Sequence, residues 1–271
     1  YVGFEAPALS ADEIWVLPSA DGSDGQMLAT DGSGTLSWIS NTAATNIDGL
    51  SDSKSEGTDF TGSLLVGHQT TGTLDAATYN TGVGLTALDA LTSGDYNTAV
   101  GYSSLTDNTT GAANTAHGNQ TLFKNIDGDR NTAIGHHSLY RNESGSHNIA
   151  IGYKSLTNTT GNSNTGVGTT ALTENTTGQY NVAVGMNVLR GQTTSHYNTA
   201  IGNNSLQDAN RTADTDGYNT ALGYNAGNTG TNDITTGNKN TLLGASTAAS
   251  AVAGTNQTVI GYGASGQANN S

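Results

Sequence analysis

Apolar residues return along this chain at a fixed short interval, which is neither helical spacing nor the alternation of long strands. A pentapeptide of the type Asn-Thr-Ala-Val/Ile-Gly recurs from about residue 62, and a leucine usually follows four residues after its glycine. The repeat glycines are Gly67, Gly84, Gly101, Gly118, Gly135, Gly152, Gly168, Gly185, Gly202, Gly223, Gly244 and Gly261. Most steps are 17 residues, one is 16 and two are 21. This period predicts a solenoid with one coil per repeat.

Within the pentapeptide, Ala and the following aliphatic residue should point to opposite faces of a short strand. We expect the aliphatic column, together with the Leu column, to form the core of each coil. The Ala column should then face an identical neighbouring chain around a three-fold axis, because only a small residue allows such close approach. Asn side chains of successive coils should pair, and glycine should permit the turn. The positions that define the repeat are Asn97, Gly101, Leu105, Asn131, Gly135, Leu139, Asn148, Gly152, Leu156, Asn198, Gly202 and Leu206.

The first 40 residues have another character, with both Trp and both Pro residues of the chain. Short strands are expected at 14–17, 26–30 and 35–39, with a turn at 31–34. So small a β module needs copies of itself to be stable. The expected parts are a β module (1–40), a linker (41–61), the repeat shaft (62–263) and a tail (264–271).

The repeat loosens toward the C-terminus, where two coils gain four residues each. Insertions in repeat proteins often form binding loops on one face, so we expect loops within 207–217 and 225–239. The candidate receptor-contact residues in them are Arg211, Asp214, Asp216, Asp233 and Lys239.

Composition narrows the range of functions. The 271 residues carry a formal net charge of −14 with only 8 Lys and Arg, which argues against nucleic acid as a partner. No apolar run is long enough for a transmembrane helix, so no membrane insertion is expected. Without cysteine, disulfides and thiolate metal sites are excluded. No nucleophile with a base and no paired carboxylates fall in register, so we expect no enzyme activity, no cofactor and no metal.

Several columns allow a more specific interpretation. The Thr column of the pentapeptide could be an ice-binding array, although β-branched residues simply suit stacked strands. His117 stands in the aliphatic column, where three copies near an axis could hold a metal, but a packed histidine is the more common case. His136 and His137 are adjacent and should point to opposite faces. Tyr residues before several of the repeat Asn could bind sugars, but we favour a supporting ladder.

The segments Asn-Thr-Ala-Val-Gly-Tyr-Ser-Ser-Leu at 97–105 and Asn-Ile-Ala-Ile-Gly-Tyr-Lys-Ser-Leu at 148–156 resemble head repeats of trimeric autotransporter adhesins. That resemblance implies a homotrimeric left-handed parallel β-roll. The stretch Trp-Val-Leu-Pro-Ser-Ala-Asp-Gly at 15–22 is followed by Gly-Gln-Met-Leu at 25–28 and Thr-Asp-Gly-Ser-Gly-Thr-Leu-Ser-Trp at 30–38. In this order and spacing the three segments resemble a module frequent in phage tail fibres.

Together these features predict an all-β fold, a homotrimeric left-handed parallel β-roll with a 17-residue repeat and a small N-terminal β module. The expected function is that of a phage tail fibre on the virion, attached to other fibre or virion proteins and binding a host cell-surface glycan or protein. The alternatives are a bacterial trimeric autotransporter-type surface adhesin and an ice-binding solenoid.

Overall fold

A computed structural model describes most of the chain. The described residues are 18–20, 23, 26–31, 33, 35–40, 53–55, 61–67, 75–209, 216–230, 233–267 and 269. The chain divides into two units, residues 1–49 and 50–271. The boundary falls inside the segment expected to be a linker.

The N-terminal unit contains an antiparallel hairpin of β1 (Gln26–Thr30) and β2 (Leu36–Ser40). The Asp31 carboxylate stabilises the connection by accepting hydrogen bonds from the backbone N–H groups of Ser33 and Thr35. These bonds hold the pKa of Asp31 below its ordinary value. The two strands predicted here are confirmed, and the strand predicted at 14–17 lies outside the described residues.

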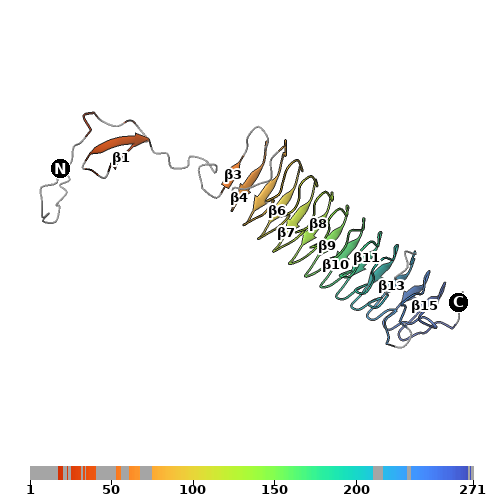
Figure 1. Ribbon diagram of the computed structural model, residues 1–271. Helices are drawn as coiled ribbons and strands as arrows, with labels where there is room; N and C mark the ends of the chain where they lie inside the picture. The colour runs from red at the N-terminus through yellow and green to blue at the C-terminus, as the bar shows by residue number, and fades with distance from the viewer. Residues whose placement is uncertain are drawn as a thin grey trace, which may run out of the picture. The chain divides into compact units, whose positions relative to one another are not determined.

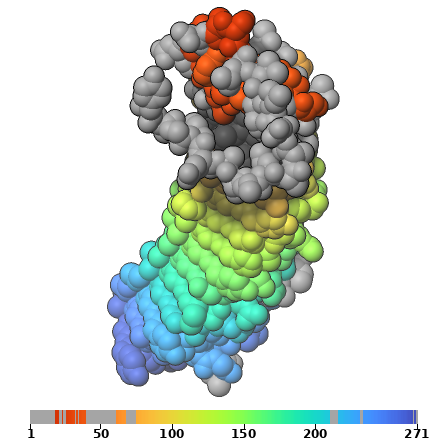
Figure 2. Space-filling model, turned by 90° about the vertical axis from the view of Figure 1, so that its left-hand side faces the viewer, coloured from red at the N-terminus to blue at the C-terminus, as the bar shows by residue number. Residues whose placement is uncertain are grey.

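The second unit is a parallel β-solenoid, as the repeat predicted. Its sheet begins with β3 (Ser53–Ser55), which pairs antiparallel with β4 (Leu64–Val66), and every later strand pairs in parallel with the one before it. Figure 1 shows the strands stacked along the unit from orange to blue, and Figure 2 shows the coils as layered bands. The later strands are β5 (Thr81–Val83), β6 (Thr98–Val100), β7 (Thr115–His117), β8 (Thr132–Ile134), β9 (Ile149–Ile151), β10 (Thr165–Val167), β11 (Val182–Val184), β12 (Thr199–Ile201), β13 (Thr220–Leu222), β14 (Thr241–Leu243) and β15 (Thr258–Ile260).

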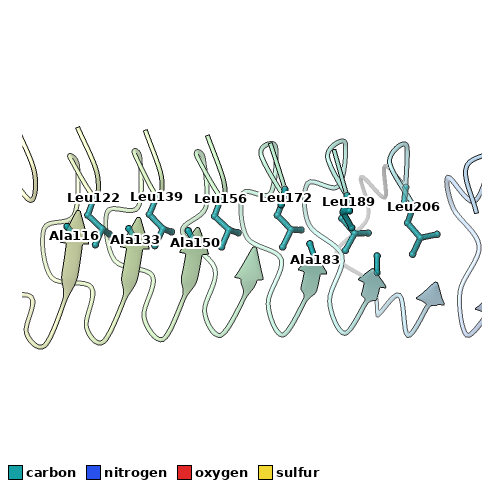
Figure 3. Packing of buried hydrophobic residues seen from close by; sticks show 14 of the residues in the cluster. Ala116, Leu122, Ala133, Leu139, Ala150, Leu156, Leu172, Ala183, Leu189 and Leu206 are labelled. Atoms are coloured by element: carbon teal, nitrogen blue, oxygen red, sulfur yellow. The ribbon is translucent and has the colours of Figure 1, made fainter. Parts of the chain in front are cut away.

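The Ala column lies inside the coils, so the predicted assignment of the two strand faces is wrong. Ala99, Ala116 and Ala133 are 0 % exposed, whereas the exposed members of the aliphatic column range from 37 to 65 %. The Leu column is buried as predicted, and its side chains enter from the limb opposite the strand (Figure 3). Because these leucines fill a thin interior, only a small side chain fits on the strand that faces them.

Buried asparagines form a ladder along the solenoid, which confirms the predicted pairing. In a typical rung, the backbone N–H and side-chain Nδ2 of Asn131 donate to Asn114 Oδ1 at 2.9 and 3.1 Å. The same Nδ2 donates to the carbonyl oxygen of Gly145 at 2.8 Å. These bonds satisfy polar groups that would otherwise be buried without partners.

The repeat glycines are required by close stacking, as Gly101 illustrates. Its φ is +133°, and a Cβ there would lie 2.4 Å from the carbonyl oxygen of Gly118 in the next coil. The Leu column is also left-handed, with φ of 51° at Leu105, for example. Such a conformation is unfavourable for leucine and persists because the stacked coils on both sides fix it.

The core of the C-terminal coils is rearranged. Gly227 replaces the usual leucine, and a Cβ there would lie 2.6 Å from Leu206 and 2.9 Å from Leu242. Leu242 stands in the Ala column and is buried, and Ile234 of the second insertion is also buried. The expectation that this insertion is only a surface loop is therefore wrong, because one of its residues completes the core.

Candidate functional site: the outward face of the sheet

The face of β4–β15 that points away from the coil interior carries two parallel columns. One is the Thr column, occupied by Leu64, Ile149 and Val182 in three coils, and the other is the aliphatic column. In-register pairing places each residue beside its counterpart in the next coil, as Ile134 beside Ile151. The outward face therefore carries rows of methyl groups, broken in the aliphatic column at β7.

The apolar part of this face is extensive. Its large exposed side chains are Val83, Ile134, Ile149, Ile151, Ile201, Leu222, Leu243 and Ile260. Twelve strands of three residues cover about 55 Å by about 10 Å, or roughly 550 Å². That area is the whole face with the Thr column included, and apolar patches of about 300–600 Å² on soluble monomers often mark interaction sites.

His117 interrupts the aliphatic column on this exposed face, between Val100 and Ile134 of the neighbouring strands. The prediction placed it in the core of its own coil, which is wrong because the whole column points outward. Among the described residues, no group of three or more His, Cys, Asp or Glu side chains is close enough to hold a metal ion.

Tyrosines stand just before five of the repeat Asn residues, in two groups of neighbouring coils. Tyr180 and Tyr197 stack at 5.1 Å between ring centroids, and so do Tyr197 and Tyr218. A second pair, Tyr79 and Tyr96, also stacks at 5.1 Å. This confirms the predicted ladder. Since the rings cover one another's faces, the inner rings present mainly edges to a ligand.

Three of the five candidate contact residues of the insertions are described, and each has its own surroundings. Arg211 and Asp214 lie outside the described residues. Asp216 is exposed, and its hydrogen bond to the Tyr218 hydroxyl raises the pKa of that tyrosine. Lys239 is exposed one coil further on, in the column of the tyrosine ladder.

Asp233 has a local role instead. Its carboxylate accepts hydrogen bonds from the backbone N–H groups of Thr229 and Gly230, and its side chain is half-buried. The Asp233 carboxylate therefore stabilises its own loop.

A surface hollow of about 290 Å³ lies elsewhere on the solenoid, lined by Glu174, Arg190, Gly191 and Asp208. Gly191 stands where neighbouring repeats carry a side chain, which opens the space. The sequence analysis did not predict this hollow. The Arg190 side chain lines it together with the carboxylates of Glu174 and Asp208.

The described part of the chain has no helix that is long and apolar enough to cross a membrane. No protein-family model, curated protein or solved structure matches this chain.

Proposed function

We propose that this chain is a structural and adhesive fibre protein, a homotrimeric left-handed β-roll that belongs to a phage tail fibre. The single observation that carries the proposal is the apolar outward face, which runs along the whole solenoid and is exposed in one chain. Three copies that turn this face toward a common axis would bury it, and a rod would result. The resemblance to adhesin head repeats and to the tail-fibre module supports the same arrangement.

Because the aliphatic column faces outward and the Ala column is buried, the residues expected to meet in that assembly differ from those predicted from the sequence. The contact would consist of the aliphatic and Thr columns, with Ile134 and Ile151 near its middle, and not of the Ala column. In the trimer the fibre would project from the virion, join other fibre or virion proteins, and attach to a glycan or protein on the host surface. Many weak contacts, multiplied by three chains, would give the attachment its strength.

Light scattering on the purified chain tests the assembly. We expect a molar mass three times 27.4 kDa. The double variant Ile134→Asp/Ile151→Asp places two charges on the outward face and should give a monomer with an unchanged β-rich circular dichroism spectrum. The matched control Thr110→Asp/Thr177→Asp adds the same charge at exposed turn positions and should remain trimeric. A monomeric wild-type chain would refute the trimer.

The bacterial surface adhesin uses the same fold and the same face, so the flanking sequence of the gene separates it from the fibre. A C-terminal membrane-anchoring barrel encoded there would favour the adhesin.

The ice-binding solenoid is a second candidate, favoured by one observation. Thr and aliphatic side chains stand side by side on a flat, regularly spaced sheet face. Thermal hysteresis by a monomeric wild-type chain, abolished by the same double variant, would favour ice binding over the fibre.

A further inference from the structure

The positive charge of this acidic chain is concentrated in one segment. Residues 117–154 contain four of the eight Lys and Arg residues and four of the six His, but only three acidic residues. The segment has a formal charge of +1. Since the whole chain has a net charge of −14, the residues outside the segment together carry −15. An anion is therefore repelled least at these coils.

The same coils carry a connected series of aromatic rings, which we call the ring patch. It consists of Phe123, Tyr140, His137, His136 and Tyr153. Centroid distances along the series are 5.3 Å from Phe123 to Tyr140, 4.7 Å from Tyr140 to His137, 3.8 Å from His137 to His136 and 5.6 Å from His136 to Tyr153. The prediction that His136 and His137 point to opposite faces is wrong, because they follow Gly135 in a turn and are no longer part of the strand.

Lysines lie over both ends of the ring patch. Lys154 Nζ is 5.2 Å from the centroid of Tyr153, and Lys124 Nζ is 5.0 Å from that of Phe123. Lys124 also forms an ion pair with Asp107 at 2.7 Å. Burial, and to a smaller extent His136 and the Lys154 charge, hold the pKa of His137 below its ordinary value.

We propose that the ring patch binds a carboxylated sugar of a surface polysaccharide, with the exposed Tyr153 packing against the sugar ring and Lys154 turning from the Tyr153 ring to pair with the sugar carboxylate. Tyr153 and His136 are exposed, and an aromatic face attracts the slightly positive C–H groups of a sugar. Gln120, hydrogen-bonded to His137 at 2.7 Å, adds an amide at the border. This inference rests on the proposed function, for which it names the ligand class.

The chemistry favours a short acidic saccharide over a nucleic acid. A nucleic acid would bring a long row of phosphates against a chain of net charge −14, and the positive segment extends over only a few coils. A sugar acid places one charge and one flat ring at each site. Three equivalent patches on a trimer would raise the overall affinity.

Other repeats supply matched controls. Tyr102 and Tyr224 stand at the same position after the repeat glycine as Tyr153. The next residue is Ser103 or Asn225 in those coils, where the 152 repeat has Lys154. The ring is thus repeated without the charge.

The test is calorimetric titration of the full chain with tri-galacturonate at pH 7 and low salt, with the trisaccharide methyl ester as the uncharged ligand. We expect the acid to bind at least tenfold more tightly than the ester. Tyr153→Ala and Lys154→Gln should each weaken binding of the acid at least fivefold, while Tyr224→Ala and Arg190→Gln, the latter at an exposed cation outside the ring patch, should leave it unchanged.

Three results would overturn the proposal: no binding of the acid, equal binding of the ester, or equal losses in the control variants. Light scattering on the same samples separates this failure from failure of the fibre. A trimer without binding removes only the ring patch, and a monomer that binds as expected removes only the trimer.

Discussion

The two faces of the same three-residue strands are both apolar, yet they follow different rules. The inward position holds Ala or Gly in most coils, because leucines from the opposite limb fill the interior. The outward position varies among Val, Ile, Leu and His, since no part of its own coil limits its size. Within one strand, packing inside the chain thus restricts size at one position, while the next position is apolar without any such restriction from its own coil.

The largest expected difference in stability is between two variants that each introduce an aspartate, at neighbouring positions of one strand. Ala133→Asp places a carboxylate in the closed interior, where it has neither water nor a basic partner, and should cost about 4 kcal/mol or more of unfolding free energy. Ile134→Asp, one residue further, points outward and should leave the solenoid folded. Circular dichroism with urea denaturation of both variants checks this, and equal losses of stability would contradict the assignment of the two faces.

The rearranged C-terminal core offers the next largest effect. Leu242→Ala removes a buried side chain that compensates for Gly227 and should cost about 3 kcal/mol. Adding Gly227→Leu restores the arrangement of the regular coils, and the φ of +72° at Gly227 is close to that of the Leu column. The double variant should therefore recover at least half of the loss in urea denaturation. A double variant less stable than Leu242→Ala would show that Leu206, which a Cβ at position 227 would meet at 2.6 Å, leaves no room for the new side chain.

Sequence alone predicted the solenoid, the strand positions, the Leu core and the asparagine ladder, because each follows from periodicity or from a buried polar column. It could not decide between the two faces. Alternation says only that Ala133 and Ile134 point in opposite directions, and choosing the larger apolar residue for the core ignored how little room Leu139 leaves. The ring patch was missed for a related reason, since strand alternation was extended past Gly135 into a turn that folds His136 against His137.

Replacing an asparagine of the ladder should cost more stability than replacing the outward-facing residue beside it. Asn131→Ala leaves the buried Asn148 N–H without its acceptor and removes one of the two side-chain donors to the Gly145 carbonyl, and should cost about 2 kcal/mol. Thr132→Ala, on the outward side of the same coil, should change stability by no more than about 0.5 kcal/mol. Urea denaturation of the two variants provides the comparison, and a similar cost for both would mean that the ladder contributes specificity of register more than stability.

The smallest expected change in stability comes from His137 in the ring patch, which lies near His136, Lys154, Tyr140 and Gln120. Because the folded state holds the pKa of His137 below 6.5, the unfolded chain takes up a proton first as the pH falls. Stability should therefore decrease below about pH 6.5 and level off once the folded histidine is protonated as well. His137→Gln keeps a donor for Gln120 and should remove this part of the pH dependence of Tm between pH 7.5 and 5. His147→Gln, exposed in the column of the tyrosine ladder, is the control. An unchanged pH profile in His137→Gln would show that the folded state does not hold the pKa of this histidine below its ordinary value.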